Sequence, residues 1–259
     1  MYQPTFEDRK GLLRTMDALE DPTGEVFTPD DAMNESMGQV IASNLRRPTY
    51  LTYDFVLEKL YVCDFWAKAI YAYPVEFKGT REIVLGDKLE VYDKISCGGL
   101  KTDKFGNLYF VDTANHWIGK LKHRDLEDWY KRNAEEGDYV NVEDLRKKVI
   151  NLYNGTTDPA ARNPLALEIE REYLYWTNRQ VDDQENVHGA IHKAFTDPFI
   201  IAAPFRTYEV QQVKKAHSIA ANEHFLFFTG IEFEDLKIDQ LSQTLAPYLD
   251  DFEEPYLFV

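Results

Sequence analysis

The sequence has few cysteines, no long apolar run and fewer basic than acidic residues. Cys63 and Cys97 are the only cysteines among 259 residues, so disulfides cannot be the main support of the fold, and a structural zinc site is no better favoured. We interpret both as buried small hydrophobes, with a single bridge as the alternative. With 29 basic against 45 acidic residues the net charge is −16, which argues against nucleic acid as a partner.

No stretch approaches the 18 apolar residues that a membrane-spanning helix needs, so no transmembrane segment is predicted. The first 30 positions carry acids where a secretory signal would have an apolar run. The chain is predicted to be soluble, in a compartment that the sequence does not identify. An organelle lumen or matrix would follow if a targeting peptide had been removed. With 44% hydrophobic and 14% aromatic residues, it can bury one sizeable core or two small ones.

The negative charge is concentrated at the two ends of the chain. Residues 1–38 hold nine acids and three bases, and residues 231–259 hold eight acids and one base. The segment 39–230 is nearly balanced, which predicts a folded body between two acidic extensions. The first extension is expected to be partly helical, and the second is either an extension or a divergent last blade. Apolar residues at helical spacing would dock each end on the body or on a partner: Leu12, Leu13, Met16 and Leu19, then Leu241, Leu245, Leu249 and Phe252.

Four segments of the body share one pattern, in which an apolar strand, a polar turn and an aromatic strand follow one another. The second strands read Leu-Tyr-Val-Cys-Asp (60–64), Leu-Tyr-Phe-Val-Asp (108–112), Leu-Tyr-Trp-Thr-Asn (174–178) and, most weakly, Leu-Phe-Phe-Thr-Gly (226–230). Short runs rich in β-branched and aromatic residues on either side of a polar turn predict β-hairpins. The matching first strands are expected in 48–54, 97–103, 162–168 and 216–222.

Two further strands complete each unit and indicate the architecture. Third strands are expected at 69–73, 117–121 and 189–194, and a fourth at 148–153. A repeat of this length and content is typical of a β-propeller with four-stranded blades, and a β-sandwich of tandem hairpins is the main alternative. The charged segment 124–148 is expected to form a helical insertion, with Leu126, Trp129 and Tyr130 facing inward. Six blades of about 45 residues would exceed this chain, so either the ring is incomplete, the chain is a fragment, or the tails supply divergent blades.

These strands resemble a known group of propellers. The segment 60–73, together with Asn-Pro-Leu-Ala-Leu (163–167) and Leu-Tyr-Trp-Thr-Asn (174–178), is similar to the six-bladed propellers of the senescence marker protein, gluconolactonase and luciferin-regenerating-enzyme group. NHL-repeat and strictosidine-synthase-like propellers are close neighbours of that group. The resemblance covers about 40–230 and implies an all-β propeller.

The resemblance also implies a place for a metal. In the lactonase branch a divalent cation at one mouth of the channel is held by Glu, Asn and Asp at the starts of inner strands, oxygen ligands that suit calcium. Aligning the repeats places this column at Thr49, Gly98, Asn163 and His217. Only Asn163 keeps a family ligand type, so it is the weak metal candidate, and the loss of two anionic ligands removes most of the attraction for a hard cation. No cofactor is expected, with calcium or zinc as the alternative.

Two other features at the same mouth remain open. His217 could bind a softer metal or act as a base, although a hydrogen-bonded channel residue is the favoured interpretation. The basic pairs Arg46-Arg47 and Lys214-Lys215 precede the inner strands. They either give the mouth a local positive field or are solvated loop charges.

His188 and His192 are four residues apart near a turn and a strand, and in a strand they lie too far apart to share one ion.

The sequence thus predicts a non-catalytic propeller that serves as a binding or scaffold subunit, contacting protein partners through its tails or blade edges. The alternative is a metal-dependent lactone or ester hydrolase that uses Asn163 and His217. A third hypothesis is an extracellular ligand-binding propeller, which predicts a signal peptide before Met1 and oxidised Cys63 and Cys97.

Overall fold

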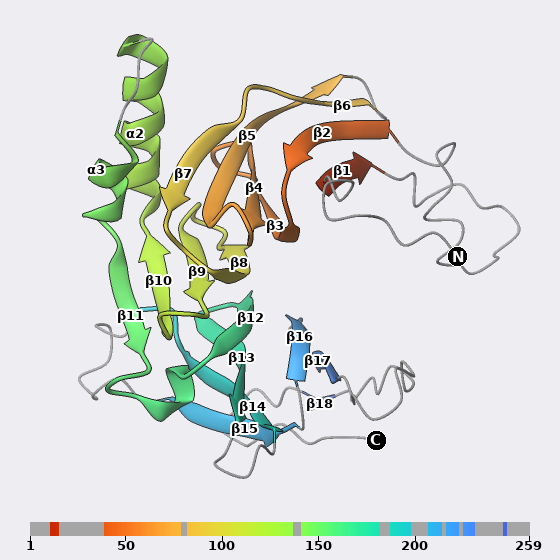
Figure 1. Cartoon of the computed structure of the whole chain (residues 1–259), viewed down its shortest axis with the longest axis vertical. Helices are drawn as coiled ribbons and strands as arrows, with labels where there is room; N and C mark the ends of the chain where they lie inside the picture. Colours follow the sequence, from red (N-terminus) through yellow and green to blue (C-terminus); the bar gives the residue numbers. More distant parts are fainter. Residues whose placement is uncertain are drawn as a thin grey trace, which may run out of the picture.

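The fold is built from antiparallel sheets that follow one another along the chain (Figure 1). The computed structural model describes residues 11–15, 39–78, 82–136, 141–181, 187–197, 207–213, 216–222, 225–230 and 246–247. Within these residues the chain forms four blade-like sheets, preceded by a two-stranded sheet of β1 (Gly11–Thr15) and β2 (Gln39–Leu45).

Each blade begins with its innermost strand and proceeds outward. The first blade consists of β3 (Pro48–Asp54), β4 (Lys59–Asp64), β5 (Ala69–Lys78) and β7 (Leu89–Asp93), and β6 (Glu82–Leu85) pairs with the far end of β5. The second consists of β8 (Cys97–Thr102), β9 (Leu108–Asp112), β10 (Trp117–Leu121) and β11 (Ile150–Asn154). The third consists of β12 (Pro164–Glu170), β13 (Tyr173–Val181), β14 (Val187–Phe195) and β15 (Tyr208–Gln212).

The fourth sheet contains β16 (Ala216–Ala221), β17 (Phe225–Gly230) and β18 (Ala246–Pro247). The first strands β3, β8, β12 and β16 lie next to one another at the centre (Figure 1). This order gives the propeller arrangement that the repeat predicts, because a sandwich would not bring the first strand of every sheet to one axis. Among the described residues the ring is incomplete.

In the first three blades, one polar residue at the end of the second strand fixes the corner of the blade. Asp64 accepts hydrogen bonds from the backbone N–H groups of Arg46, Arg47 and Ala67 at 2.6, 2.8 and 3.1 Å. Asp112 accepts from the backbone and side chain of Asn115, and Asn178 accepts from the N–H of Ala190. The final Asp or Asn of the repeated motif is therefore structural, since it satisfies buried backbone donors.

The residue after this corner makes the same backbone bond in three blades. The N–H groups of Phe65, Thr113 and Arg179 donate to the carbonyls just before the inner strands, at 2.9, 3.0 and 3.1 Å; the acceptors are Arg47, Ser96 and Asn163. Each inner strand is thereby held to its own hairpin at one end.

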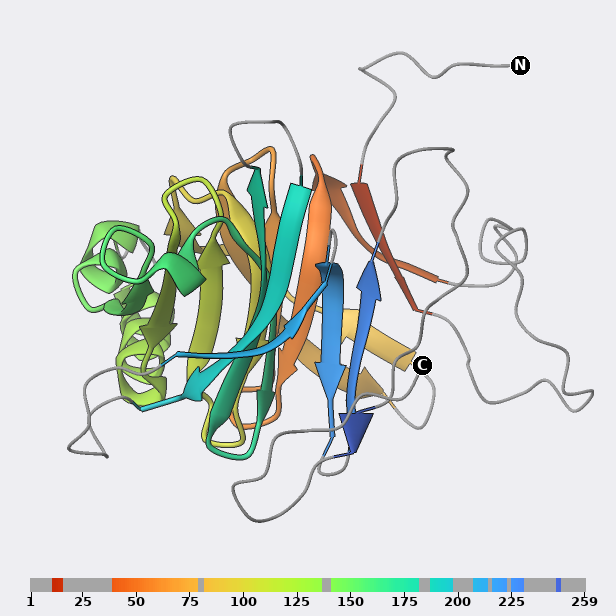
Figure 2. The same cartoon turned by 90° about the horizontal axis from the view of Figure 1, so that it is seen from below.

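The predicted insertion is helical and lies at the outer edge of the second blade (Figures 1 and 2). It forms α2 (His123–Glu136) and α3 (Val142–Arg146). Leu126 and Trp129 are buried, as predicted, and Tyr130 is largely enclosed, with its hydroxyl donating to that of Tyr61 at 3.2 Å. The helices therefore extend the core between the first two blades. No helix within the described ranges has the length and apolar character needed to cross a membrane.

The two cysteines are fully buried, as expected, but the unbridged interpretation is wrong. Cys63 in β4 and Cys97 in β8 form a disulfide, with their Cα atoms 5.6 Å apart. The bond joins the first blade to the second. The cause is the packing of neighbouring blades, which brings the end of one second strand beside the start of the next inner strand.

The acidic ends are described only in part. Gly11–Thr15 is a strand paired with β2, so Leu12 and Leu13 do not lie on the predicted helical face. The free edge of β2 offers backbone hydrogen bonds that override a weak helical periodicity. Of 231–259, Ala246–Pro247 pairs with β17 as a short strand. The other apolar positions expected on helical faces, and Lys214-Lys215, lie outside the described residues.

Candidate functional site

The four predicted site residues do not share one structural position. A β-bulge follows the first paired residue of every inner strand, and Thr49, Gly98 and His217 lie in it in the first, second and fourth blades. In the third blade Pro164 pairs with Asn178, which places Leu165 at that position. Asn163 precedes the strand, because the sequence alignment of the third unit is offset by two residues.

The geometry around this column is close-packed. Thr49 is exposed, with its hydroxyl 3.5 Å from the carbonyl oxygen of Cys97. Gly98 is buried, and a Cβ added there would clash with Oγ1 of Thr113 and lie 3.0 Å from the carbonyl oxygen of Leu165. A larger residue would therefore have to displace the Thr113 side chain and approach the neighbouring inner strand closely.

Asn163 has a left-handed backbone, with φ of 46°. Its N–H donates to Nδ1 of His116 at 3.2 Å and its carbonyl accepts the corner bond from Arg179. These contacts give it a turn-forming role at the entry to β12. The side chain of His217 lies outside the described residues.

The described side chains of this column offer few ligands to a hard divalent cation. Such ions require several oxygen ligands, usually including carboxylates. Thr49 supplies one hydroxyl, Gly98 has no side chain, and the side chain of Leu165 is aliphatic. Across the described ranges, no three His, Cys, Asp or Glu side chains lie close enough to hold a metal ion.

Both arginines of the predicted pair, Arg46 and Arg47, make contacts in the structure. Both backbone N–H groups bind Asp64. The guanidinium of Arg47 also lies 5.5 Å from the ring centre of Phe65 and 5.4 Å from that of Trp66. Cation–π contact holds this charge over the corner of the first blade.

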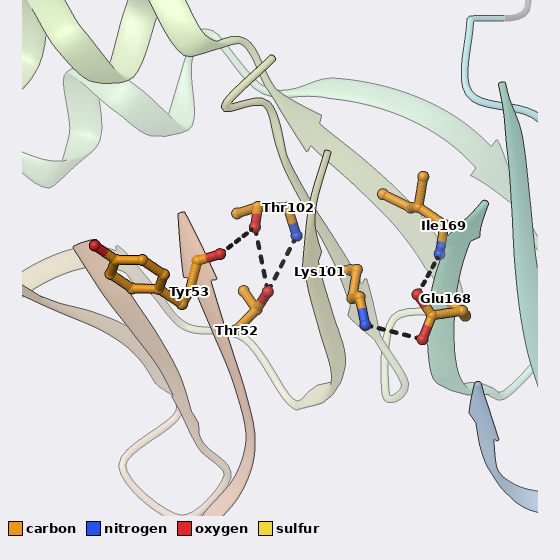
Figure 3. A network of polar contacts seen from close by, with 6 residues as sticks. All are labelled: Thr52, Tyr53, Lys101, Thr102, Glu168 and Ile169. Atoms are coloured by element: carbon orange, nitrogen blue, oxygen red, sulfur yellow. Dashed lines mark hydrogen bonds and ion pairs between the residues drawn. The ribbon is translucent and has the colours of Figure 1, made fainter. Parts of the chain in front are cut away.

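A second column, at the other end of the inner strands, carries the polar contacts between blades. Thr52, Lys101, Glu168 and Ala220 occupy equivalent positions, because each pairs with the aromatic anchor of its blade: Tyr61, Tyr109, Tyr175 and Phe227 respectively. Side chains at this level reach across from one inner strand to the next (Figure 3).

The contacts of this column join the blades in succession. The hydroxyl groups of Thr52 and Thr102 lie 3.2 Å apart, and the Thr102 hydroxyl donates to the carbonyl of Tyr53 at 3.0 Å. The ammonium of Lys101 donates to Oε2 of Glu168 at 2.9 Å. Both sets of bonds are visible in Figure 3, and they connect the first blade to the second and the second to the third.

A further bond reaches the fourth blade. The hydroxyl of Ser218 in β16 hydrogen-bonds that of Tyr50 in β3, which lowers the pKa of the tyrosine against the larger, raising effect of burial. The inner strands of the first and fourth blades are therefore also linked through their side chains.

Glu168 is the charged residue most enclosed in this network, with its side chain 8% exposed. Burial raises its pKa, and the neighbouring Lys101 opposes that rise. Its second oxygen accepts from the N–H of Ile169 at 2.9 Å, so both oxygens have donors. The carboxylate thus joins the second blade to the third.

Lys101 and Glu168 were not among the residues predicted from the sequence. The available signal was their equal offset, four residues after the first paired residue of the inner strand in consecutive units. Opposite charges at equivalent positions of adjacent repeats predict an inter-blade pair once the units are aligned correctly.

Comparison with known proteins gives structural neighbours only. No protein-family model matches the chain, and no curated protein matches its sequence. A gluconolactonase from Xanthomonas campestris is similar with a TM-score of 0.46 and 9% identity, covering 81% of this chain and 60% of its own. A streptogramin B lyase is similar with a TM-score of 0.41 and 12% identity, and the match covers 82% of this chain and 54% of the lyase. A luciferin-regenerating enzyme is similar with a TM-score of 0.38 and 14% identity, and the match covers 56% of this chain and 42% of the enzyme.

The resemblance expected from the sequence is therefore found among solved propeller structures. The chain spans about half the length of these neighbours. At 9–14% identity their activities do not transfer to this chain, and its function has to follow from its own residues.

Proposed function

We propose that this chain is a non-catalytic propeller module that binds a protein partner. The observation that carries the proposal is an exposed aromatic patch at the hairpin ends of the first two blades, formed by Tyr53, Phe55, Val56, Phe77 and Phe105. The side chains of Phe55, Phe105 and Phe77 are 85%, 64% and 59% exposed.

The patch is continuous rather than scattered. The Tyr53 ring lies 4.7 Å from that of Phe55 and 5.9 Å from that of Phe77, both edge-on. The turn carrying Phe105 is adjacent, since a Cβ on Gly106 would lie 3.2 Å from Cβ of Val56. Clustered exposed aromatics are typical of protein interfaces, whose centres are enriched in such side chains.

The neutral residues at the mouth of the inner strands support the non-catalytic part of the proposal. Thr49, Gly98 and Leu165 offer no carboxylate to a metal, and the enclosed Glu168 is committed to Lys101. A partner could also use the acidic tails, which the sequence analysis favoured.

The test is site-specific photocrosslinking in full-length protein. A photoreactive phenylalanine analogue at Phe55 or Phe105 should crosslink one protein, and the same analogue at Tyr208, exposed on β15, should not. The captured protein is then purified and its affinity measured. We expect Phe55→Ser/Phe105→Ser to weaken binding at least about tenfold and Tyr208→Ser to leave it unchanged. Equal affinity of all three proteins would overturn the proposed surface.

Two further measurements separate the alternatives. Calorimetric titration with calcium, manganese and zinc should give no micromolar binding. Such binding, lost in Asn163→Ala, would instead support the metal-dependent hydrolase. Deleting 231–259 tests the tail: loss of the partner with an unchanged circular-dichroism spectrum would assign binding to that segment.

A further inference from the structure

A cavity of about 670 Å³ lies beside the outer strands of the third blade. Its polar lining comes from Asp158, Asn178, His192, Thr207, Glu209 and Gln212. The volume is within the range of small-molecule sites. The cavity is separate from the aromatic patch, which lies on the first two blades.

The sheet lines this cavity with residues of two cross-strand rows, although Trp176 of the first row is not itself in the lining. Trp176, His192 and Glu209 pair in succession across β13, β14 and β15. Asn178, Ala190 and Gln212 form the neighbouring row on the same face. Directly paired residues have Cβ atoms about 5 Å apart, so these side chains converge.

A short 3-10 helix, Pro159–Ala161, adds Pro159 and Ala160 to the lining. Its Ala160 carbonyl accepts hydrogen bonds from Nε1 of Trp176 at 2.8 Å and from Nδ2 of Asn178 at 3.3 Å. Two side chains of the sheet thus hold this turn against the third blade.

His192 is the unusual residue of the lining. It is 5% exposed, and neither ring nitrogen has a hydrogen-bond partner. A buried polar group without a partner costs free energy, so its retention calls for an explanation. Burial lowers its pKa, against the opposing charges of Glu209 and Asp158, and the neutral imidazole keeps one nitrogen as an acceptor.

The remaining polar atoms also favour accepting hydrogen bonds. Oδ1 of Asp158 receives the Ala160 N–H and the Thr207 hydroxyl, and Oε1 of Glu209 receives the Gln212 amide. Among the described residues no hydrogen bond uses the second oxygen of either carboxylate. Among the described residues that line the cavity there is no Lys or Arg. A ligand that matches this lining must bring donors and positive charge.

We propose that this cavity binds a small aliphatic amine in its protonated form. The ammonium is held between Asp158 and Glu209 and donates to the free nitrogen of His192, with a small adjustment of side chains to reach it. Pro159, Ala160 and Val213 supply apolar surface for the carbon chain. A single metal ion is disfavoured, because no metal-binding group of three ligands is present within the described residues.

The experiment uses putrescine as the probe and 1,4-butanediol as its uncharged analogue. Isothermal titration is run on the full chain and on Asp158→Asn/Glu209→Gln, which removes both charges while Asn keeps the cap and Gln keeps an amide oxygen for Gln212. The control is Glu58→Gln/Glu172→Gln, two exposed acids elsewhere on the surface. It changes the net charge by the same amount.

We expect putrescine to bind, the diol not to bind, and the cavity variant to lose at least about tenfold in affinity while the control keeps it. The imidazole NMR signals of His192 should shift, and those of His123 on α2 should not. If the cavity variant and the control variant bind putrescine with equal affinity, the binding is a diffuse attraction to an acidic chain. That result would overturn the proposal. Absence of binding up to about 10 mM, or unchanged His192 signals, would do the same. The amine test and the partner-binding test can fail separately, because Phe55→Ser/Phe105→Ser changes the aromatic patch of the first two blades and not the cavity beside the third.

Discussion

Lys101 of the second blade and Glu168 of the third form a 2.9 Å ion pair between two inner strands. Lys101 is 36% exposed and the carboxylate is 8% exposed, so the pair lies at the border between core and solvent. The cost of desolvating Glu168 is offset in part by the lysine and by the N–H of Ile169.

Removing only the lysine should destabilise the protein. Lys101→Met leaves an enclosed carboxylate without its counter-ion, and we expect the free energy of unfolding to fall by about 1–3 kcal/mol. Urea denaturation at pH 7 measures this fall. Lys101→Met/Glu168→Leu should recover most of it, and Lys104→Met, at an exposed turn, is the control. A loss no larger than that of the control would contradict a structural role for the pair.

The pH dependence should identify the same carboxyl. Burial raises the pKa of Glu168 above its ordinary value of 4.5, so the folded protein holds this proton more tightly than the unfolded chain. The resulting stability is complete below pH 4.5 and is lost as the pH rises through the raised pKa. Glu168→Gln cannot titrate, so its stability relative to the parent should improve from about pH 4 to pH 7. A constant difference across thermal melts in this range would refute the assignment, and Glu58→Gln, at an exposed turn of the first blade, is the control.

Reduction of Cys63–Cys97 should weaken the first two blades. The cysteines are 34 residues apart, and closing a loop of this length stabilises a fold by about 3–4 kcal/mol in the chain-entropy treatment. We expect Cys63→Ala/Cys97→Ala to lower the unfolding free energy by an amount of this order and to abolish the effect of dithiothreitol on Tm. The parent protein can be unfolded without a reducing agent and its reactive thiols counted. Two reactive thiols would show that no disulfide forms.

Gly99 should be intolerant of even one methyl group. A Cβ there would lie 2.7 Å from the carbonyl oxygen of Leu165 and 2.9 Å from the N–H nitrogen of Leu167. Because both neighbours are backbone atoms of β12, relief requires the second and third blades to separate, at a cost of about 1–3 kcal/mol. Gly86→Ala, whose added methyl meets only the ring of Pro74, should cost less in the same denaturation series. Similar costs for both would contradict the close approach.

The sequence was sufficient to find the hairpins and their order. Motifs such as Leu-Tyr-Phe-Val-Asp (108–112) combine a β-rich run with a polar corner residue, and both requirements are local. The helical insertion was equally legible, because Leu126 and Trp129 are spaced for one buried face. These features need no knowledge of the neighbouring blades.

Features that arise between strands or blades were not predictable in the same way. Asn163 was placed two residues away from the true column position because the units were aligned by residue type. The true position is set by strand pairing, in which Pro164 pairs with Asn178. The disulfide depends on how tightly two blades pack. His192 was judged by its spacing from His188, whereas its setting depends on Glu209 and on a turn that is remote in sequence. Short β6 also escaped notice, since it only extends the far end of β5.

The bridge between β4 and β8 has a mechanical consequence. It is a covalent tie between the first two blades, while the later blades are held to their neighbours by packing and polar contacts. Under tension applied to the two ends, the C-terminal blades can peel away one after another. The loop closed by Cys63 and Cys97, which are 34 positions apart in the sequence, remains shielded from the load.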